Sequence, residues 1–129
     1  MPLEIKEINH VSLWVSNVSQ SVNFYKNMLG LEQLQNRPAF DFDGAWFALG
    51  ERQQLHILEG RTGETNHSHS RRNHFALEVE SLAAAEAFLK NQNISYIGPK
   101  PRPDGVMQIF IQDPDGYWLE LTELSKNKN

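Results

Sequence analysis

The sequence predicts an α+β fold made of two tandem βαβββ modules. Three observations support this prediction. The chain matches itself at an offset of 64 residues, and residues 8–27 align with residues 72–91 at seven identities in 20 pairs. Each copy opens with alternating apolar and polar residues followed by a helical stripe. Each copy then continues with three further strand-like segments.

The first copy begins with a strand over residues 8–16, which are rich in Val, Leu and Trp. Asn17 is the expected N-cap of a helix whose apolar stripe ends near Leu29. Gly30 suits the left-handed conformation that often follows a helix. Three further strands are expected in this copy, at residues 31–36, 40–49 and 53–59.

The second copy repeats this order. A strand is expected over residues 73–80, Ser81 is the expected N-cap, and the helix covers residues 82–92. Residues 113–116, Asp-Pro-Asp-Gly, are expected to form a tight turn, because Pro presets φ and Gly permits a positive φ. Strands are expected at residues 94–97, 106–112 and 117–124.

The whole chain, residues 1–129, is predicted to be a single domain of two modules. Residues 61–71 are polar and lack periodicity, which is typical of a linker. Module one therefore spans residues 5–60 and module two spans residues 72–124. Neither module is long enough to bury a large core alone.

Composition narrows the classes of function. The formal net charge is −4, and there is no long run of Lys or Arg, which argues against a nucleic-acid partner. There is no cysteine, so thiolate ligands, cysteine nucleophiles and disulfides are excluded. No apolar run approaches the length of a membrane span. The charged start of the chain does not resemble a signal peptide, so a cytoplasmic protein without membrane contact is expected.

Strand alternation places four polar side chains on the face opposite the helices: His10, His56, His74 and Glu120. They occupy two pairs of equivalent repeat positions, His10/His74 and His56/Glu120. Three imidazoles and one carboxylate suit one divalent ion of Zn, Ni, Co, Mn or Fe. Spacing alone leaves a second interpretation open, in which these are surface residues on polar strand faces.

A second group of residues forms a candidate substrate site. Small-molecule sites have apolar walls and few polar groups, and an arginine such as Arg37 or Arg102 can pair with a carboxylate. Core packing and solvated surface arginines are the alternatives. The substrate-binding candidates are Arg37, Trp46, Gln108, Phe110 and Trp118.

Several motifs resemble the vicinal oxygen chelate superfamily, which includes glyoxalase I, bleomycin-resistance proteins and extradiol dioxygenases. The motifs are INHVSLWV, SVNFYKNMLGLE, LHIL, NHFALEV and DPDGYWLELTE, and together they extend over residues 5–124. Residues 37–58 also resemble a glyoxalase-I-like branch of plants and bacteria.

The resemblance implies that the two modules form a cup-shaped mixed sheet around one metal ion, with the helices outside. Carried over position by position, it names the same four ligands, His10, His56, His74 and Glu120. Bacterial glyoxalase I usually has Glu at the position of His56. Glu120 is therefore the first candidate for the catalytic base, and His56 is the second.

The function implied is a lyase or isomerase of the lactoylglutathione lyase type. Its substrate would be a 2-oxoaldehyde–thiol hemithioacetal, with glutathione or another thiol, and the reaction would pass through an enediolate. The alternatives are an extradiol-type Fe(II) dioxygenase, a thiol transferase of the fosfomycin-resistance type, and a metal-free binding or sequestering protein. A homodimer is also expected, since two short modules expose sheet edges.

Overall fold

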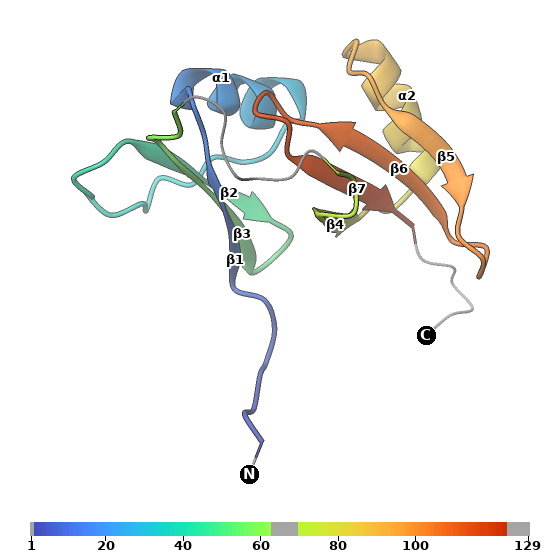
Figure 1. Ribbon diagram of the computed structural model, residues 1–129, viewed down its shortest axis with the longest axis horizontal. Coiled ribbons are helices and arrows are strands. Elements are labelled where there is room, and N and C mark those ends of the chain that lie inside the picture. Colours follow the sequence, from blue (N-terminus) through green and yellow to red (C-terminus); the bar gives the residue numbers. More distant parts are fainter. Residues whose placement is uncertain (1, 63–69, 124–129) are drawn as a thin grey trace. The chain divides into compact units, whose positions relative to one another are not determined.

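The computed structural model describes residues 2–62 and 70–123. The chain divides into two compact units, Met1–Thr65 and Asn66–Asn129, each of which is described by itself. Each unit contains one small mixed sheet (Figure 1). The order of elements, strand–helix–strands, is the same in both units, as the internal repeat predicts.

The first unit has a three-stranded sheet in the order β1-β3-β2. β1 runs parallel to β3, and β2 runs antiparallel to it. His56 in β3 therefore lies between Ser12 of β1 and Trp46 of β2. The elements are β1 (His10–Trp14), α1 (Val18–Val22), η1 (Asn23–Met28), β2 (Gly44–Leu49) and β3 (Gln53–Leu58).

The second unit has a four-stranded sheet in the order β4-β7-β6-β5. β4 is parallel to β7, while β6 is antiparallel to both of its neighbours. Glu120 in β7 therefore lies between Ala76 of β4 and Phe110 of β6. The elements are β4 (His74–Glu78), α2 (Leu82–Asn91), β5 (Ile97–Pro101), β6 (Met107–Gln112) and β7 (Trp118–Thr122).

The apolar rows predicted for the strands form the cores of the two units. Leu55 and Ile57 of β3 are buried, as are the repeat-equivalent Leu119 and Leu121 of β7. Both helices begin where the sequence indicated. The Asn17 side chain accepts a hydrogen bond from the backbone N–H of Gln20, and the Ser81 hydroxyl accepts one from Ala84. The α+β class is confirmed.

Two local predictions for the first unit were wrong. The expected strand over residues 31–36 is only a single bridge, Gln33 to Phe47, with one backbone hydrogen bond on either side. Pro38 follows closely, and a residue without an N–H cannot continue a ladder as a donor. The expected α-helix continues from residue 23 as a π-helix, in which the N–H of Leu29 bonds to the carbonyl of Phe24.

Within residues 2–62 and 70–123, no helix has the length and apolar character needed to cross a membrane.

Candidate functional site

His74 and Glu120 form the central polar pair of the second unit. His74 opens β4 and Glu120 lies in the middle of β7, so the parallel pairing of the two strands brings them to one face. His74 Nε2 is 2.9 Å from Glu120 Oε1. Glu120 is only 4% exposed. Burial of a carboxylate is costly unless it is paired. The contact with His74 therefore compensates for the burial of Glu120.

The backbone determines which nitrogen of His74 faces Glu120. His74 Nδ1 lies 2.6 Å from the carbonyl oxygen of Arg71. A carbonyl can only accept, so Nδ1 must donate its proton there. A contact between Nε2 and a carboxylate oxygen is then favourable only when a proton or a metal ion lies between them. Metal-binding histidines almost always have this arrangement, with the other ring nitrogen donating to a carbonyl or a carboxylate.

The spacing of the pair also fits a metal ion. Nitrogen and oxygen ligands lie about 2.0–2.2 Å from ions such as Zn²⁺, so two ligands at right angles are roughly 3 Å apart. The observed separation of 2.9 Å is close to that of two neighbouring ligands in an octahedral site, and it is also that of a hydrogen-bonded imidazolium–carboxylate pair. His74 and Glu120 could therefore bind one divalent ion with little movement of either side chain.

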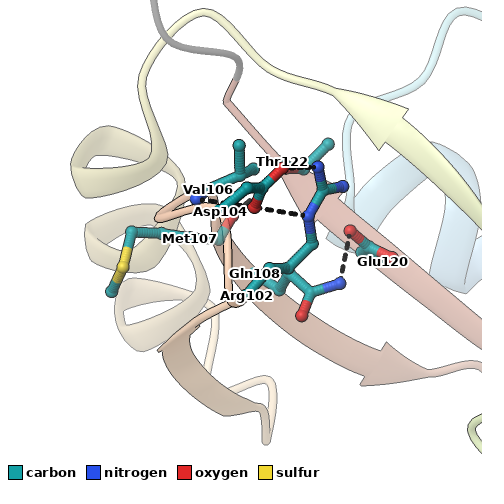
Figure 2. A network of polar contacts seen from close by, with 7 residues as sticks. All are labelled: Arg102, Asp104, Val106, Met107, Gln108, Glu120 and Thr122. Carbon is teal, nitrogen blue, oxygen red and sulfur yellow. Dashed lines mark hydrogen bonds and ion pairs between the residues drawn. The ribbon is translucent and has the colours of Figure 1, made fainter.

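The second oxygen of Glu120 is held by Gln108. The Gln108 amide nitrogen donates to Glu120 Oε2 at 3.0 Å, across the β6–β7 ladder (Figure 2). Gln108 was expected to bind substrate, and the structure places its amide against the candidate metal ligand instead. The role in substrate binding stays a prediction.

Aromatic side chains border this pair, as the alternation of β6 and β7 indicated. The ring of Phe110 meets His74 edge-on at 5.3 Å between centroids, and it meets Trp118 edge-on at 6.5 Å. The guanidinium of Arg71 lies 5.5 Å from the centre of the Phe110 ring. Phe110 thus fixes one side of the His74 ring.

In the first unit, His56 is the middle ring of a three-ring stack. Its centroid is 4.1 Å from that of His10, with the planes 16° apart, and 4.1 Å from that of Trp46, with the planes 4° apart. His56 Nε2 lies 2.8 Å from the Gln54 side-chain oxygen, and His10 Nδ1 lies 2.8 Å from the Asn9 side-chain oxygen. Both amide oxygens accept from the ring that they contact.

The stack has two consequences for metal binding. The lone pair of an imidazole nitrogen lies in the ring plane, so nearly parallel rings do not aim their lone pairs at one point. His10 and His56 would have to rotate relative to each other to share an ion. Burial first, and then the neighbouring His10 and Arg37, lower the pKa of His56 to about 4. His56 is therefore neutral at pH 7.

Arg37 lies beside this stack and is held by its own loop. Its guanidinium donates to the carbonyl oxygen of Phe42 at 2.9 Å and lies about 5 Å from the ring centres of Phe40 and Phe42. Its positive charge contributes to lowering the pKa of His56. The sequence therefore identified an arginine close to a candidate site residue, and its contact with substrate stays a prediction.

Each unit thus brings together two of the four predicted ligands, His10 with His56 in the first unit and His74 with Glu120 in the second. Among residues 2–62 and 70–123, no group of three or more His, Asp or Glu side chains is clustered as a metal site would need. The sequence did not reveal the partners of the histidines. Asn9 and Gln54 are polar neighbours on the same strands and could have been noted, but the Arg71 carbonyl lies in a stretch that reads as a linker.

Both units have the strand–helix–strands order expected from the repeat, and in each unit the first and last strands carry the candidate polar residues. The profile of the Glyoxalase/Bleomycin resistance protein/Dioxygenase superfamily matches residues 7–121. The chain therefore belongs to this superfamily, as its motifs indicated.

Known relatives include proteins with different activities. Glyoxylase I 4 of Arabidopsis thaliana is 29% identical over 126 residues, which cover 93% of this chain and 72% of the relative. Metallothiol transferase FosB of Staphylococcus saprophyticus is 30% identical over 121 residues, which cover 91% and 76%. A solved glyoxalase family protein from Bacillus anthracis superposes with a TM-score of 0.80 at 28% identity, covering 97% of this chain and all of the other.

Proposed function

We propose that this protein is a metal-dependent enzyme that isomerises a 2-oxoaldehyde–thiol hemithioacetal, in the manner of glyoxalase I. The observation that carries the proposal is the His74–Glu120 pair, with its 2.9 Å separation and its Nδ1 proton directed at a carbonyl. The similarity to Glyoxylase I 4 supports this reaction. A divalent ion bound there would act as a Lewis acid toward two neighbouring substrate oxygens.

We assign three ligands, His74, Glu120 and His10. His10 is the repeat counterpart of His74, and its Nδ1 contact with Asn9 leaves Nε2 as the nitrogen with a lone pair. His56 becomes a fourth ligand only if its ring leaves the stack with Trp46 and His10. We therefore propose three protein ligands rather than four.

Glu120 is the candidate for moving the proton between the two substrate carbons. A carboxylate oxygen has two lone pairs, so Oε2 can accept a substrate proton while Gln108 still donates to it. His56 is the weaker candidate, because its ring is stacked between His10 and Trp46 and its Nε2 already donates to the Gln54 side chain. We propose that Arg37, Trp46, Phe110 and Trp118 line the substrate site, which is supported by their contacts around His56 and His74.

One observation favours a second function, transfer of a thiol to an epoxide. The stacked His56 leaves a ligand set of two histidines and one glutamate, and that set suits this chemistry as well as Fe(II) dioxygenase chemistry. Among the relatives, several metallothiol transferases are 27–30% identical to this chain. Thiol transfer is therefore the second candidate.

One experiment separates these functions. The purified protein is stripped of metal, loaded in turn with Zn²⁺, Ni²⁺, Co²⁺, Mn²⁺ or Fe²⁺, and assayed with methylglyoxal plus glutathione and with an epoxide antibiotic plus several thiols. Thioester formation that requires one of these ions and is lost in His74→Ala supports the proposal. Thiol adduct formation alone would shift the assignment to the second candidate. Failure to bind any of the ions would overturn both and leave a metal-free binding protein.

A further inference from the structure

Several polar contacts in the turn before β6 position Gln108. The turn that leads into β6 is closed by a hydrogen bond of 2.7 Å from the N–H of Arg102 to the carbonyl of Val106. The Arg102 guanidinium forms an ion pair with Asp104, whose carboxylate also accepts from the N–H of Val106 (Figure 2). These contacts fix Val106, which directly precedes β6 and lies two residues before Gln108.

The other side of Gln108 is fixed by the sheet. Gln108 pairs with Lys100 of β5 and with Thr122 of β7, so its backbone lies between two strands. The Thr122 hydroxyl donates to the carbonyl of Met107 at 3.1 Å, next to Gln108. The Gln108 side chain then reaches diagonally to Glu120, which is the type of cross-strand contact that long side chains can make.

The Gln108 amide and the His74 ring contact different oxygens of Glu120. Glu120 presents Oε1 to His74 at 2.9 Å while Gln108 donates to Oε2 at 3.0 Å. The Gln108 N–H on Oε2 holds the carboxylate in one rotation with Oε1 toward His74, so Oε1 is the oxygen offered to an ion there and the second lone pair of Oε2 stays open to a substrate proton. Without this hydrogen bond, both oxygens could turn toward the ion.

We infer that Gln108 is a positioning residue that keeps Glu120 a one-oxygen ligand of the bound ion. This inference rests on the proposed metal site. It goes beyond that site because it makes the neutral side chain of Gln108 responsible for the way in which Glu120 would coordinate the ion. Outer-shell partners of metal ligands typically change metal affinity by about 10- to 100-fold when removed. A role limited to substrate contact would leave metal affinity unchanged.

The test uses Co²⁺, whose visible absorption reports the number and geometry of its ligands. Metal-free wild type and Gln108→Met are titrated with Co²⁺, and affinities are measured by competition with a chromogenic chelator. Gln108→Met is expected to weaken binding by roughly 10- to 100-fold and to change the shape of the spectrum at saturation. Gln112→Met is the matched control, since Gln112 lies on the same strand but donates to the carbonyl of Gly116. It should match the wild type.

Each result has a distinct meaning. If the wild type binds no Co²⁺, the proposed function fails. If the wild type binds Co²⁺ and Gln108→Met gives the same affinity and spectrum, the metal site stands and this inference is overturned. Should Gln108→Met not fold by circular dichroism, Gln108→Asn retains an amide that is one methylene too short, and the same loss and spectral change are expected. Unchanged binding in Gln108→Asn would overturn the inference as well.

Discussion

Replacing Glu120 with glutamine should leave the fold intact and weaken the metal site. A glutamine side chain has almost the same shape as glutamate. Its oxygen can still accept from Gln108, and its NH₂ can donate to His74 Nε2, because the Arg71 carbonyl keeps the proton of His74 on Nδ1. No buried polar atom of this network loses its partner. Metal binding loses its charged oxygen ligand.

The size of the effect can be estimated by linkage. A metal-free chain of 129 residues has an unfolding entropy of ~0.27 kcal/mol/K. Free metal at 100 times the dissociation constant stabilises the folded state by ~2.7 kcal/mol, which corresponds to a rise in Tm of about 10 °C. If binding in Glu120→Gln is about 100-fold weaker, the same metal concentration gives ~0.4 kcal/mol, or a rise of about 1.5 °C.

The assay is a thermal melt of each protein with and without metal, together with turnover. The metal-free melting temperatures of wild type and Glu120→Gln should agree closely. Turnover should fall by roughly 10²- to 10⁴-fold, which is the usual contribution of a general base. An equal metal-induced shift in both proteins would show that Glu120 is not a ligand. A large loss of stability in the metal-free variant would show that the description of the hydrogen-bond network is wrong.

Three further predictions concern stability and assembly. Among the described residues, the hydroxyl of Ser21 is a buried polar atom without a hydrogen-bond partner, so Ser21→Ala should raise stability by about 1 kcal/mol, a Tm increase of roughly 4 °C by calorimetry. Ser19→Ala on the exposed face of the same helix is the control and should raise stability less, by the difference in helix propensity alone. The pKa of His56 lies below its ordinary value in the fold, so the metal-free protein should lose stability as the pH falls from about 6.5 toward 4. Urea unfolding at pH 7 and pH 5 should show a smaller loss for His56→Gln. Light scattering should find a homodimer, since β1 and β4 are edge strands; a monomer at micromolar concentration contradicts this.

Strand periodicity was sufficient to place the candidate ligands. His10, His56, His74 and Glu120 were all assigned to the strand face opposite the helices from alternation alone, and within each unit the two of them lie in contact, while their role as ligands stays a prediction. Periodicity works here because side chains on a pleated strand have only two directions.

The partners of these residues could not be obtained in the same way. Whether His56 stacks on Trp46 or turns toward an ion depends on side-chain rotation, which no residue spacing encodes. The contact of Gln108 with Glu120 depends on the diagonal offset between β6 and β7, and thus on the register. The change to a π-helix at Asn23 likewise depends on tertiary packing, because Phe24 and Tyr25 are adjacent in sequence and are both buried.

The parallel pairing of the first and last strands in each unit has a consequence for the order of folding. His10 and His56 are separated by 46 positions, and so are His74 and Glu120, because each pair joins the beginning of a unit to its end. Contacts between residues so far apart in the sequence form late, because closing the intervening loop costs conformational entropy before the contact can form. During synthesis, the stack of the first unit can form before residue 120 has left the ribosome. The second pair closes only when β7 is in place, so a chain that ends before β7 lacks the carboxylate of the site altogether.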